Sequence, residues 1–582
     1  MDNKIYDAIV VGSGFGGSVM ALRLARAGLS VCVLERGQEY PPGSFPRTPT
    51  AMRQNFWEPG DGLQGLFDIW SFDGLDAVVA SGVGGGSLIY SNVLLRQDPG
   101  WMVTNGKPWP FTRERLDPYY DAVEAILRPG PYPQDCPPYD RTPRTRAMAE
   151  GARLIAERTG NPAALRIPLA VAFGNDGARP RPGEPFRDAP GHNMYGVPRV
   201  TCRLCSECNI GCNDGSKHTL DLTYLSLARE AGATILPRCE VRAFWPAERR
   251  GVGGRSATWH VEYVIHESER QGQRYRRAEL PARTLTARSL FLCAGTFGST
   301  FLLLRMRQER GLSGLSPALG SRFSGNGDLL TVILRARHAG REGGMTPRAL
   351  EPNFGPVITS AIRGSDALDR GGPERDDERG FYIEDAGFPT ILSWLVETAP
   401  ATGRLGRSLR LAGRYLLRRL GWDQGARIGD AFSDFIGDTA LTHTSLPLVS
   451  MGRDVPSGRL HLNGDSRLDG EWDLEASRPY LERLRETCAD LARALHGEHV
   501  DNPLWHLDQL ITVHPLGGAP MADDPAEGVV DPHGRVFGYP GLYVADGSIL
   551  PGPVGPNPAL TIAALAERIA EQFLADWHAE AR

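Results

Sequence analysis

The first 35 residues contain the pattern that most constrains the fold of this chain. The apolar stretch Ile5–Val11 predicts a short buried strand, and the glycine-rich run Gly12–Gly17 follows it directly. A helical pattern over Ser18–Arg26 and a second apolar strand, Ser30–Leu34, come next, and Glu35 ends the unit. The order strand, glycine turn, helix, strand and acid predicts a parallel βαβ unit that binds a dinucleotide.

Each of three glycines in this turn has its own physical reason. Gly12 permits the tight turn, Gly14 lets the backbone approach a pyrophosphate, and Gly17 lets helix and strand pack closely. The helix N-terminus faces the phosphate charge, and Glu35 is placed to bind a ribose hydroxyl. The motif alone does not distinguish FAD from NAD.

Length and charge set limits on the function classes. The 582 residues are enough for two or more large domains or for one large discontinuous enzyme fold. A net charge of −5 gives no global electrostatic reason to bind nucleic acid. No secretory pattern and no apolar run of membrane-spanning length is found, so we expect a cytoplasmic protein with reduced thiols.

Further landmarks follow the first unit in a set order. They are SGVGGGSLIYSN (Ser81–Asn92), RSLFLCAGTFGSTFLLL (Arg288–Leu304), GNGD (Gly325–Asp328), HPLGG (His514–Gly518) and the C-terminal stretch Gly541–Arg568. Together these motifs resemble the glucose–methanol–choline (GMC) family of FAD oxidoreductases, and within it the cholesterol-oxidase-like branch.

The resemblance implies an α/β fold with two discontinuous domains. One is a Rossmann-like FAD-binding domain, and the other is an α+β substrate or cap domain built on an antiparallel sheet. We expect residues 1–50, 215–318 and 535–582 to form the FAD-binding domain. Residues 51–214 and 319–534 are then expected to form the substrate domain, with the cysteine cluster 202–212 inside it.

The resemblance also implies which residues bind FAD. The first glycine turn should hold the pyrophosphate, Glu35 the adenosine ribose and the backbone of Val241 the adenine. The second glycine-rich loop should pass along the isoalloxazine, and Asp546 and Gly547 should meet the ribityl and pyrophosphate portion. That second loop has no histidine, so non-covalent FAD is expected. The full expected set is Gly12, Gly14, Gly17, Glu35, Gly82, Gly84, Gly85, Gly86, Ser87, Asn92, Val241, Gly295, Asp546, Gly547, Asn557 and Pro558.

Two residues match the family's catalytic positions. His514 lies in HPLGG and Asn557 in GPNPALT, where the family places an active-site histidine and this branch an asparagine. The resemblance implies that hydride passes to flavin N5 while His514, with Asn557, handles the hydroxyl group. Histidine suits that proton transfer because its ordinary pKa lies near neutral pH. Taken alone, both residues are also ordinary turn residues.

The resemblance is less specific for the substrate. It implies a bulky apolar alcohol, sterol-like or similar, with molecular oxygen or an electron-acceptor protein or quinone as the oxidant. The same fold also hosts FAD lyases and light-driven decarboxylases, and an FAD-bound electron-transfer protein is a further alternative. Cholesterol oxidase uses a glutamate for isomerisation, but His443 stands near that position here, and Glu384 belongs to a different motif.

Four cysteines gather within eleven residues, at Cys202, Cys205, Cys208 and Cys212. Their C-x2-C-x2-C-x3-C spacing matches a bacterial ferredoxin run, although Asn213 follows where ferredoxins have proline. Three interpretations stay open at this point: an iron–sulfur cluster, a structural zinc site, or four reduced thiols in a loop. Some GMC-type sugar dehydrogenases carry an iron–sulfur cluster in the corresponding place, which favours the first.

The stretch 403–422 has an unusual distribution of charge. Leucines recur at helical spacing on one side and arginines on the other, with no acidic residue between them. A basic amphipathic helix can lie on an anionic membrane surface, and it can equally pack on its own domain. We therefore keep peripheral membrane contact as an alternative for this stretch.

Overall fold

The computed structural model describes residues 4–159, 164–247, 258–340, 343–390 and 440–580. Within these residues, seven strands form one sheet, in the order β11-β2-β1-β14-β13-β12, with β25 also paired to β14. Strands β11, β2, β1, β14 and β25 run parallel, whereas β12 and β13 are antiparallel. The strands are β1 (Ile5–Val11), β2 (Val31–Leu34), β11 (Thr234–Leu236), β12 (Cys239–Pro246), β13 (Trp259–Ile265), β14 (Arg283–Leu292) and β25 (Leu542–Val544).

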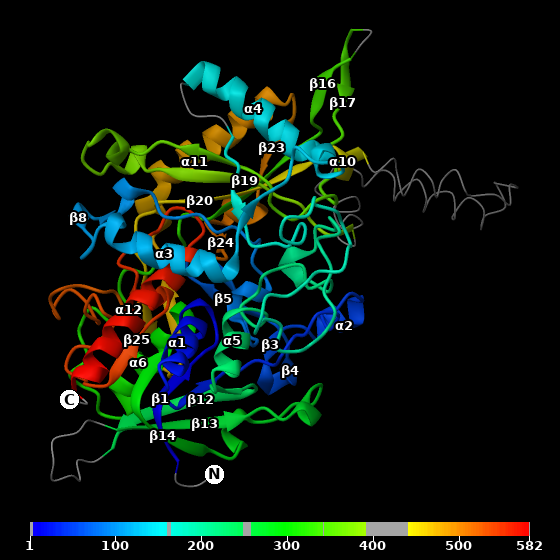
Figure 1. Ribbon diagram of the computed structural model, residues 1–582. Coiled ribbons are helices and arrows are strands. Elements are labelled where there is room, and N and C mark those ends of the chain that lie inside the picture. The colour runs from blue at the N-terminus through cyan, green and yellow to red at the C-terminus, as the bar shows by residue number, and fades with distance from the viewer. Residues whose placement is uncertain (1–3, 160–163, 248–257, 341–342, 391–439, 581–582) are drawn as a thin grey trace, which may run out of the picture.

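Helix α1 (Phe15–Arg26) lies between β1 and β2 in the chain and packs against α12 (Ala559–Glu580) and α5 (Tyr224–Glu230). These helices cover the sheet in the lower half of Figure 1. The predicted βαβ unit and the Rossmann-like fold class are confirmed. The helix begins three residues earlier than the pattern predicts, because Gly16 and Gly17 belong to its buried first turn.

A second sheet lies in the upper half of Figure 1 and is antiparallel throughout. Its order is β18 (Ala361–Gly364), β19 (Phe381–Asp385), β20 (Leu446–Gly452), β15 (Leu329–Leu334) and β23 (Glu498–Asp501). Helices α4 (Pro143–Thr159) and α11 (Leu474–Ala494) pack on it. This is the expected antiparallel sheet, while the domain boundaries given above stay predictions.

A three-stranded sheet, β24 (Leu510–Thr512), β6 (Leu75–Ala80) and β5 (Phe67–Phe72), lies beside the two larger ones. One hydrophobic cluster extends through the elements of both large sheets. The other elements are α2 (Pro49–Arg53), β3 (Trp57–Glu58), β4 (Leu63–Gln64), β7 (Val103–Thr104), β8 (Lys107–Pro108), α3 (Arg113–Leu127), β9 (Gly130–Pro131), β10 (Pro168–Leu169), α6 (Gly295–Glu309), β16 (Arg337–Ala339), β17 (Met345–Pro347), α10 (Ala440–His443), β21 (Arg459–Leu462) and β22 (Leu468–Glu471).

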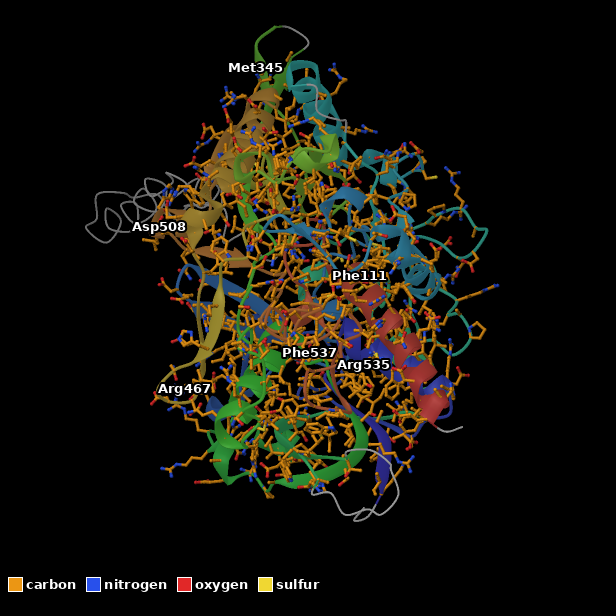
Figure 2. All side chains as sticks on the ribbon, turned by 90° about the vertical axis from the view of Figure 1, so that its left-hand side faces the viewer. Phe111, Met345, Arg467, Asp508, Arg535 and Phe537 are labelled. Atoms are coloured by element: carbon orange, nitrogen blue, oxygen red, sulfur yellow. The ribbon has the colours of Figure 1, made fainter. Side chains whose placement is uncertain are left out.

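Side chains fill the space between the ribbons throughout the body of the molecule (Figure 2). The β16–β17 hairpin projects from it, with Met345 near its tip and 42% exposed. Among the described residues, no helix is both long and apolar enough to cross a membrane. The predicted amphipathic helix at 403–422 lies outside the described residues.

Candidate active site

A cavity of about 680 Å³ is lined by residues of both large sheets. Val11, Leu34 and Cys293 reach it from the carboxyl ends of the parallel strands β1, β2 and β14. Leu330 and Leu448 reach it from the antiparallel sheet. The carboxyl ends of parallel strands are where open α/β sheets bind their ligands, so this cavity is the candidate site.

The glycines of the first glycine turn differ in how closely other protein atoms approach them. Gly12 has φ +96°, and a Cβ there would lie 2.3 Å from the carbonyl oxygen of Cys293. A Cβ on Gly17 would lie 2.1 Å from the carbonyl oxygen of Gly12, so both positions are required by packing. A Cβ on Gly14, by contrast, would meet no protein atom within 4 Å, and Gly14 lines the cavity. The free space beside Gly14 fits the close approach of a pyrophosphate.

Glu35 lines the cavity and is also bound to the glycine turn. Its Oε2 accepts hydrogen bonds from the backbone N of Ser13 (3.0 Å) and from Ser13 Oγ (2.6 Å), and its Oε1 accepts from Gly37 N (2.8 Å). Ser13 Oγ in turn accepts from the backbone N of Gly84 at 3.1 Å. Ser13, which the sequence analysis did not single out, therefore joins the two glycine-rich loops.

The second glycine-rich loop meets the first directly. Gly85 and Gly86 line the cavity, and a Cβ on Gly85 would lie 2.7 Å from Gly14 Cα. The role of the rest of this loop in binding FAD stays a prediction. Ser87 Oγ bonds within the loop to Gly84 O at 2.7 Å, and other positions are held against the protein interior. The expected residues that do not line the cavity are Gly17, Gly82, Gly84, Ser87 and Asn92.

The remaining expected positions form a continuous part of the wall. Helix α6 begins at Gly295, whose backbone N donates to Asp546 Oδ2 at 2.9 Å. Asp546 is 5% exposed, and burial raises the pKa of its carboxyl. A helix N-terminus and a glycine turn on one cavity wall fit the charge and shape of FAD. The expected cofactor residues that line the cavity are Gly12, Gly14, Glu35, Gly85, Gly86, Val241, Gly295, Asp546, Gly547, Asn557 and Pro558.

His514 also lines the cavity, and its ring is oriented by Asp328. Its Nδ1 lies 2.8 Å from Asp328 Oδ1. The other oxygen of Asp328 accepts from Thr512 Oγ1 and from Val513 N, both at 2.8 Å. Because the carboxylate holds the proton on Nδ1, Nε2 is the basic nitrogen of the neutral ring. In the sequence, Asp328 stands out only as the last residue of GNGD, and the motif predicts no role for it.

Asn557 lines the same cavity and is 7% exposed. Its Nδ2 donates to Glu384 Oε2 at 3.4 Å. Glu384, on β19, is fully buried, and this burial raises the pKa of its carboxyl well above the ordinary value. Burial therefore favours the neutral form of the Glu384 carboxyl behind Asn557. His443, at the end of α10, is exposed and does not line the cavity.

The four clustered cysteines do not form a ligand set in this structure. No group of three or more His, Cys, Asp or Glu side chains in the described part of the chain could hold a metal ion. Cys202 and Cys208 belong to an apolar cluster, whereas Cys205 is exposed and Cys212 Sγ contacts Ser216 Oγ at 3.2 Å. The iron–sulfur and zinc sites at these residues stay predictions, which this side-chain arrangement does not support.

Burial also affects the protonation of these thiols in the absence of a metal ion. Burial raises the pKa of Cys205 to about 12 and the pKa of Cys202 well above its ordinary value. A metal ligand must be a thiolate, and burial here favours the neutral thiol. The choice among the three interpretations of the cysteine spacing stays a prediction.

Two family models match parts of the chain. One, described as GMC oxidoreductase, matches residues 456–566, and the other, described as NAD(P)-binding Rossmann-like domain, matches residues 10–43. A cholesterol oxidase of Mycobacterium tuberculosis is 31% identical over 594 aligned residues, covering 97% of this chain and 90% of that protein. This chain belongs to the GMC oxidoreductase family. It is an FAD-dependent oxidoreductase.

Other relatives of this GMC oxidoreductase differ in the substrates that their names state. A cholesterol oxidase of Acinetobacter baumannii is 26% identical, covering 98% of this chain and 94% of its own length. Paromamine 6'-oxidase of Streptomyces fradiae is 25% identical, covering 99% and 92%. The crystal structure of pyridoxine 4-oxidase from Mesorbium loti superposes with a TM-score of 0.54 at 17% identity, over 98% of this chain and 99% of that one. This last similarity concerns the fold alone.

Proposed function

We propose that this GMC oxidoreductase oxidises the hydroxyl group of a bulky apolar alcohol to a ketone or aldehyde, with non-covalently bound FAD. The observation that carries the proposal is the contact between His514 and Asp328. The His514 ring lines the same cavity as Asn557 and the glycine turns. A base oriented by a carboxylate, beside an amide, is what the deprotonation of an alcohol needs.

His514 is assigned the role of base. Its Nε2 takes the proton of the substrate hydroxyl, and Asp328 stabilises the imidazolium that results. Bound FAD supplies the two-electron acceptor for the hydride of the carbinol carbon.

Asn557 is assigned the role of hydroxyl partner. One N–H of its amide is directed to Glu384, which fixes the orientation of the group and leaves the second N–H for the substrate oxygen. Glu384 thus orients the amide, and its burial favours the neutral carboxyl over the charged one.

The walls around these polar groups favour an apolar substrate. Leu330, Ile358, Leu448 and Val449 line the cavity on the side of the antiparallel sheet. Molecular oxygen is the proposed electron acceptor, because the relatives named above are oxidases. A protein or quinone acceptor is the alternative that the assay must include.

The test is a screen of purified holoenzyme against alcohols of the kinds that the relatives' names give: cholesterol, paromamine and pyridoxine. We expect anaerobic bleaching of the flavin by an apolar alcohol such as cholesterol, and reoxidation by oxygen with release of hydrogen peroxide. Bleaching by paromamine or pyridoxine alone would contradict the apolar substrate class. Reoxidation only by a quinone would contradict the oxidase assignment.

A further inference from the structure

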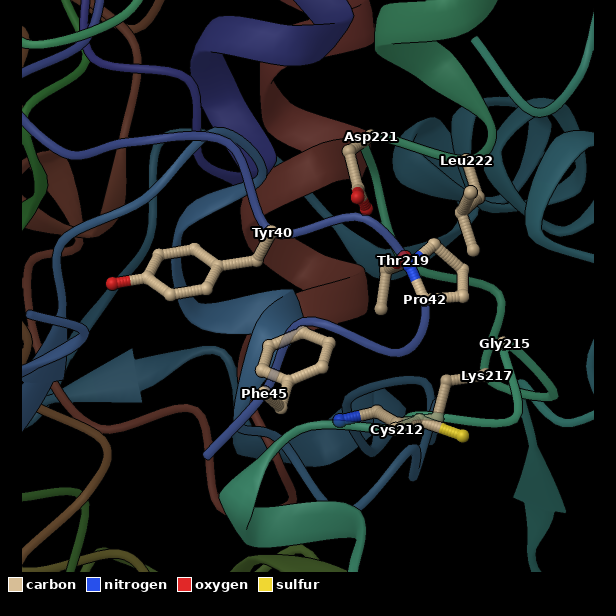
Figure 3. Close-up of a pocket in the computed structure, with 9 residues that line it drawn as sticks. All are labelled: Tyr40, Pro42, Phe45, Cys212, Gly215, Lys217, Thr219, Asp221 and Leu222. Atoms are coloured by element: carbon tan, nitrogen blue, oxygen red, sulfur yellow. The ribbon is translucent and has the colours of Figure 1, made fainter. Parts of the chain in front are cut away.

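A second and much smaller cavity lies beside the loop Cys202–Cys212 (Figure 3). Lys217 and Cys212 lie on one side of it, and Asp221 lies on the other. Its volume is about 10 Å³, room for about one water molecule and too little for a substrate. This cavity therefore offers no second place for the substrate, whose hydroxyl must meet His514 and Asn557 in the large cavity.

One buried turn, residues 324–328, holds the segment that carries His514. The backbone N of Ser324 donates to Leu516 O at 3.0 Å, and the backbone N of Leu516 donates to Ser324 O at 2.9 Å. At the other end of the turn, Asp328 Oδ1 lies 2.8 Å from Nδ1 of His514. The turn therefore sets both the backbone of the histidine segment and the orientation of the ring.

Asn326, in the middle of the same turn, holds the loop that leads to Asn557. Its Oδ1 accepts hydrogen bonds from the backbone N of Val554 at 2.9 Å and from that of Gly555 at 3.1 Å. Its Nδ2 donates to the carbonyl oxygens of Gly555 at 3.3 Å and of Pro556 at 3.1 Å. Because Pro556 directly precedes Asn557, these four hydrogen bonds fix the backbone that carries the Asn557 amide.

An asparagine side chain matches this set of hydrogen bonds in full. An amide oxygen accepts two hydrogen bonds and an amide nitrogen donates two, and Asn326 makes all four. The residue is 0% exposed, so water does not compete for these groups. Its φ of +53° is a conformation that asparagine adopts more readily than most residues. Side chain and backbone therefore both favour asparagine at this position.

The turn is in turn anchored to the antiparallel sheet. Asp454 accepts from Ser324 Oγ at 2.6 Å and from the backbone N of Gly325 at 3.1 Å. The backbone N of Gly452, the last residue of β20, donates to Asn326 O at 2.9 Å. These contacts fix the turn at the residues that hold the two catalytic segments, so it is a rigid support for both.

We propose that Asn326 is a positioning residue for Asn557. Asp328, in the same turn, orients His514, so one turn sets where the base lies relative to the amide partner. Both groups must meet one hydroxyl oxygen, and a shift of either therefore lowers the rate of oxidation. Asn326 does not line the cavity and acts through the backbone of residues 554–556. This inference rests on the proposed function for the role of Asn557 in the reaction.

Hydrogen–deuterium exchange of the holoenzyme tests this positioning without any turnover. Asn326→Gly removes the side chain and tolerates the positive φ, so the amides of Val554 and Gly555 should exchange about three- to tenfold faster than in the wild type. Asn105→Gly is the matched control, because Asn105 has φ +52°, is exposed and does not line the cavity. Unchanged exchange of both amides in Asn326→Gly would overturn the proposal.

Asn326→Asp gives a second variant in case Asn326→Gly does not fold. It keeps the size of the side chain and an acceptor for the two backbone N–H groups, but it loses the amide donors to Gly555 and Pro556. We expect this variant to bind FAD as the wild type does and to reduce it more slowly with an apolar alcohol. Flavin reduction at the wild-type rate in Asn326→Asp would contradict the positioning role.

A double-mutant cycle separates positioning of Asn557 from a general disturbance. The readout is the first-order rate of anaerobic flavin reduction by an apolar alcohol. Asn326→Gly should slow this rate by about 10- to 100-fold, and the double variant with Asn557→Ala should be no slower than Asn557→Ala alone. Two losses that multiply would show that Asn326 does not act through Asn557.

Exchange and flavin reduction together distinguish this inference from the proposed function. If the exchange at Val554 and Gly555 rises in Asn326→Gly but no alcohol reduces the flavin, the positioning of the loop stands and the alcohol oxidation fails. If alcohols reduce the flavin, and Asn557→Ala slows this step while Asn326→Gly does not, the oxidation stands and the positioning role fails.

Discussion

Asp328 Oδ1 lies 2.8 Å from Nδ1 of His514, although 186 residues separate them in the chain. Asp328 directly precedes β15, and His514 follows β24. Two different sheets therefore bring the pair together. The other oxygen of this carboxylate, Oδ2, accepts hydrogen bonds from Thr512 Oγ1 and from the backbone N of Val513. The histidine that we propose as base is therefore held by a carboxylate with both of its oxygens engaged.

The first prediction concerns this carboxylate. Asp328→Asn should retain FAD but lower kcat for alcohol oxidation by about 10- to 100-fold, because the ring loses its preferred tautomer and the charge that stabilises the imidazolium. The measurement is the pH profile of kcat: the acidic limb, on which the base becomes protonated, should shift in the variant. An unchanged profile with a lower kcat would indicate a purely structural effect of Asp328.

The second prediction uses the free space beside Gly14. A Cβ there meets no protein atom within 4 Å, yet the position lines the cavity, so Gly14→Ala should fold normally and bind FAD more weakly. Gly464→Ala is the matched control, because its Cβ also meets nothing within 4 Å and Gly464 does not line the cavity. Flavin content per folded protein is the measurement. Full flavin content in Gly14→Ala would contradict the placement of FAD.

The third prediction concerns the loop Cys202–Cys212, which contains the four clustered cysteines. Cys205→Ser should leave flavin content and turnover unchanged, since Cys205 is exposed and belongs to no metal-ligand group within the described residues. Protein purified under anaerobic conditions should contain no stoichiometric iron, sulfide or zinc. Stoichiometric iron and sulfide that disappear in Cys205→Ser would restore the cluster hypothesis.

The fourth prediction concerns the pH dependence of stability. Asp454 is buried beside the turn that precedes Asp328, where its carboxyl accepts from Ser324 Oγ at 2.6 Å and Gly325 N at 3.1 Å. Burial raises the pKa of Asp454 to about 7, from 3.8. Between these values the folded protein holds a proton that the unfolded chain releases, so this group makes stability fall as pH rises through that window, by no more than about 4 kcal/mol.

Asp454→Asn removes this titrating group. Urea unfolding of wild type and variant at pH 5 and pH 8 should show a smaller loss of stability with rising pH in the variant. Equal losses in the two proteins would show that Asp454 does not titrate in this range.

Local features of the fold could be predicted from the sequence. Strand β1 covers the residues that the apolar run predicts. Such a run can be recognised in the sequence without knowing which strands pair with it. The sequence pattern predicts the start of α1 three residues too late, because Gly16 and Gly17 have low helix propensity. Close packing of these glycines against Ala545 O and Gly12 O overrides that propensity.

Contacts between distant segments could not be predicted in the same way. His514 was expected from its motif, but its orienting partner Asp328 and the link through Ser13 to Gly84 depend on how separate sheets meet. The cysteine spacing predicts a metal site, but spacing does not show burial. Cys202 and Cys208 are packed among apolar side chains, and a metal site there stays a prediction.

The most direct test of the account is anaerobic stopped-flow reduction of the flavin by an apolar alcohol, in wild type and in His514→Ala with equal FAD content. We predict that the first-order rate of bleaching falls by about 10²- to 10⁴-fold in the variant, because the hydroxyl proton has no base. Bleaching at the wild-type rate in His514→Ala would contradict the assignment of His514 as the base.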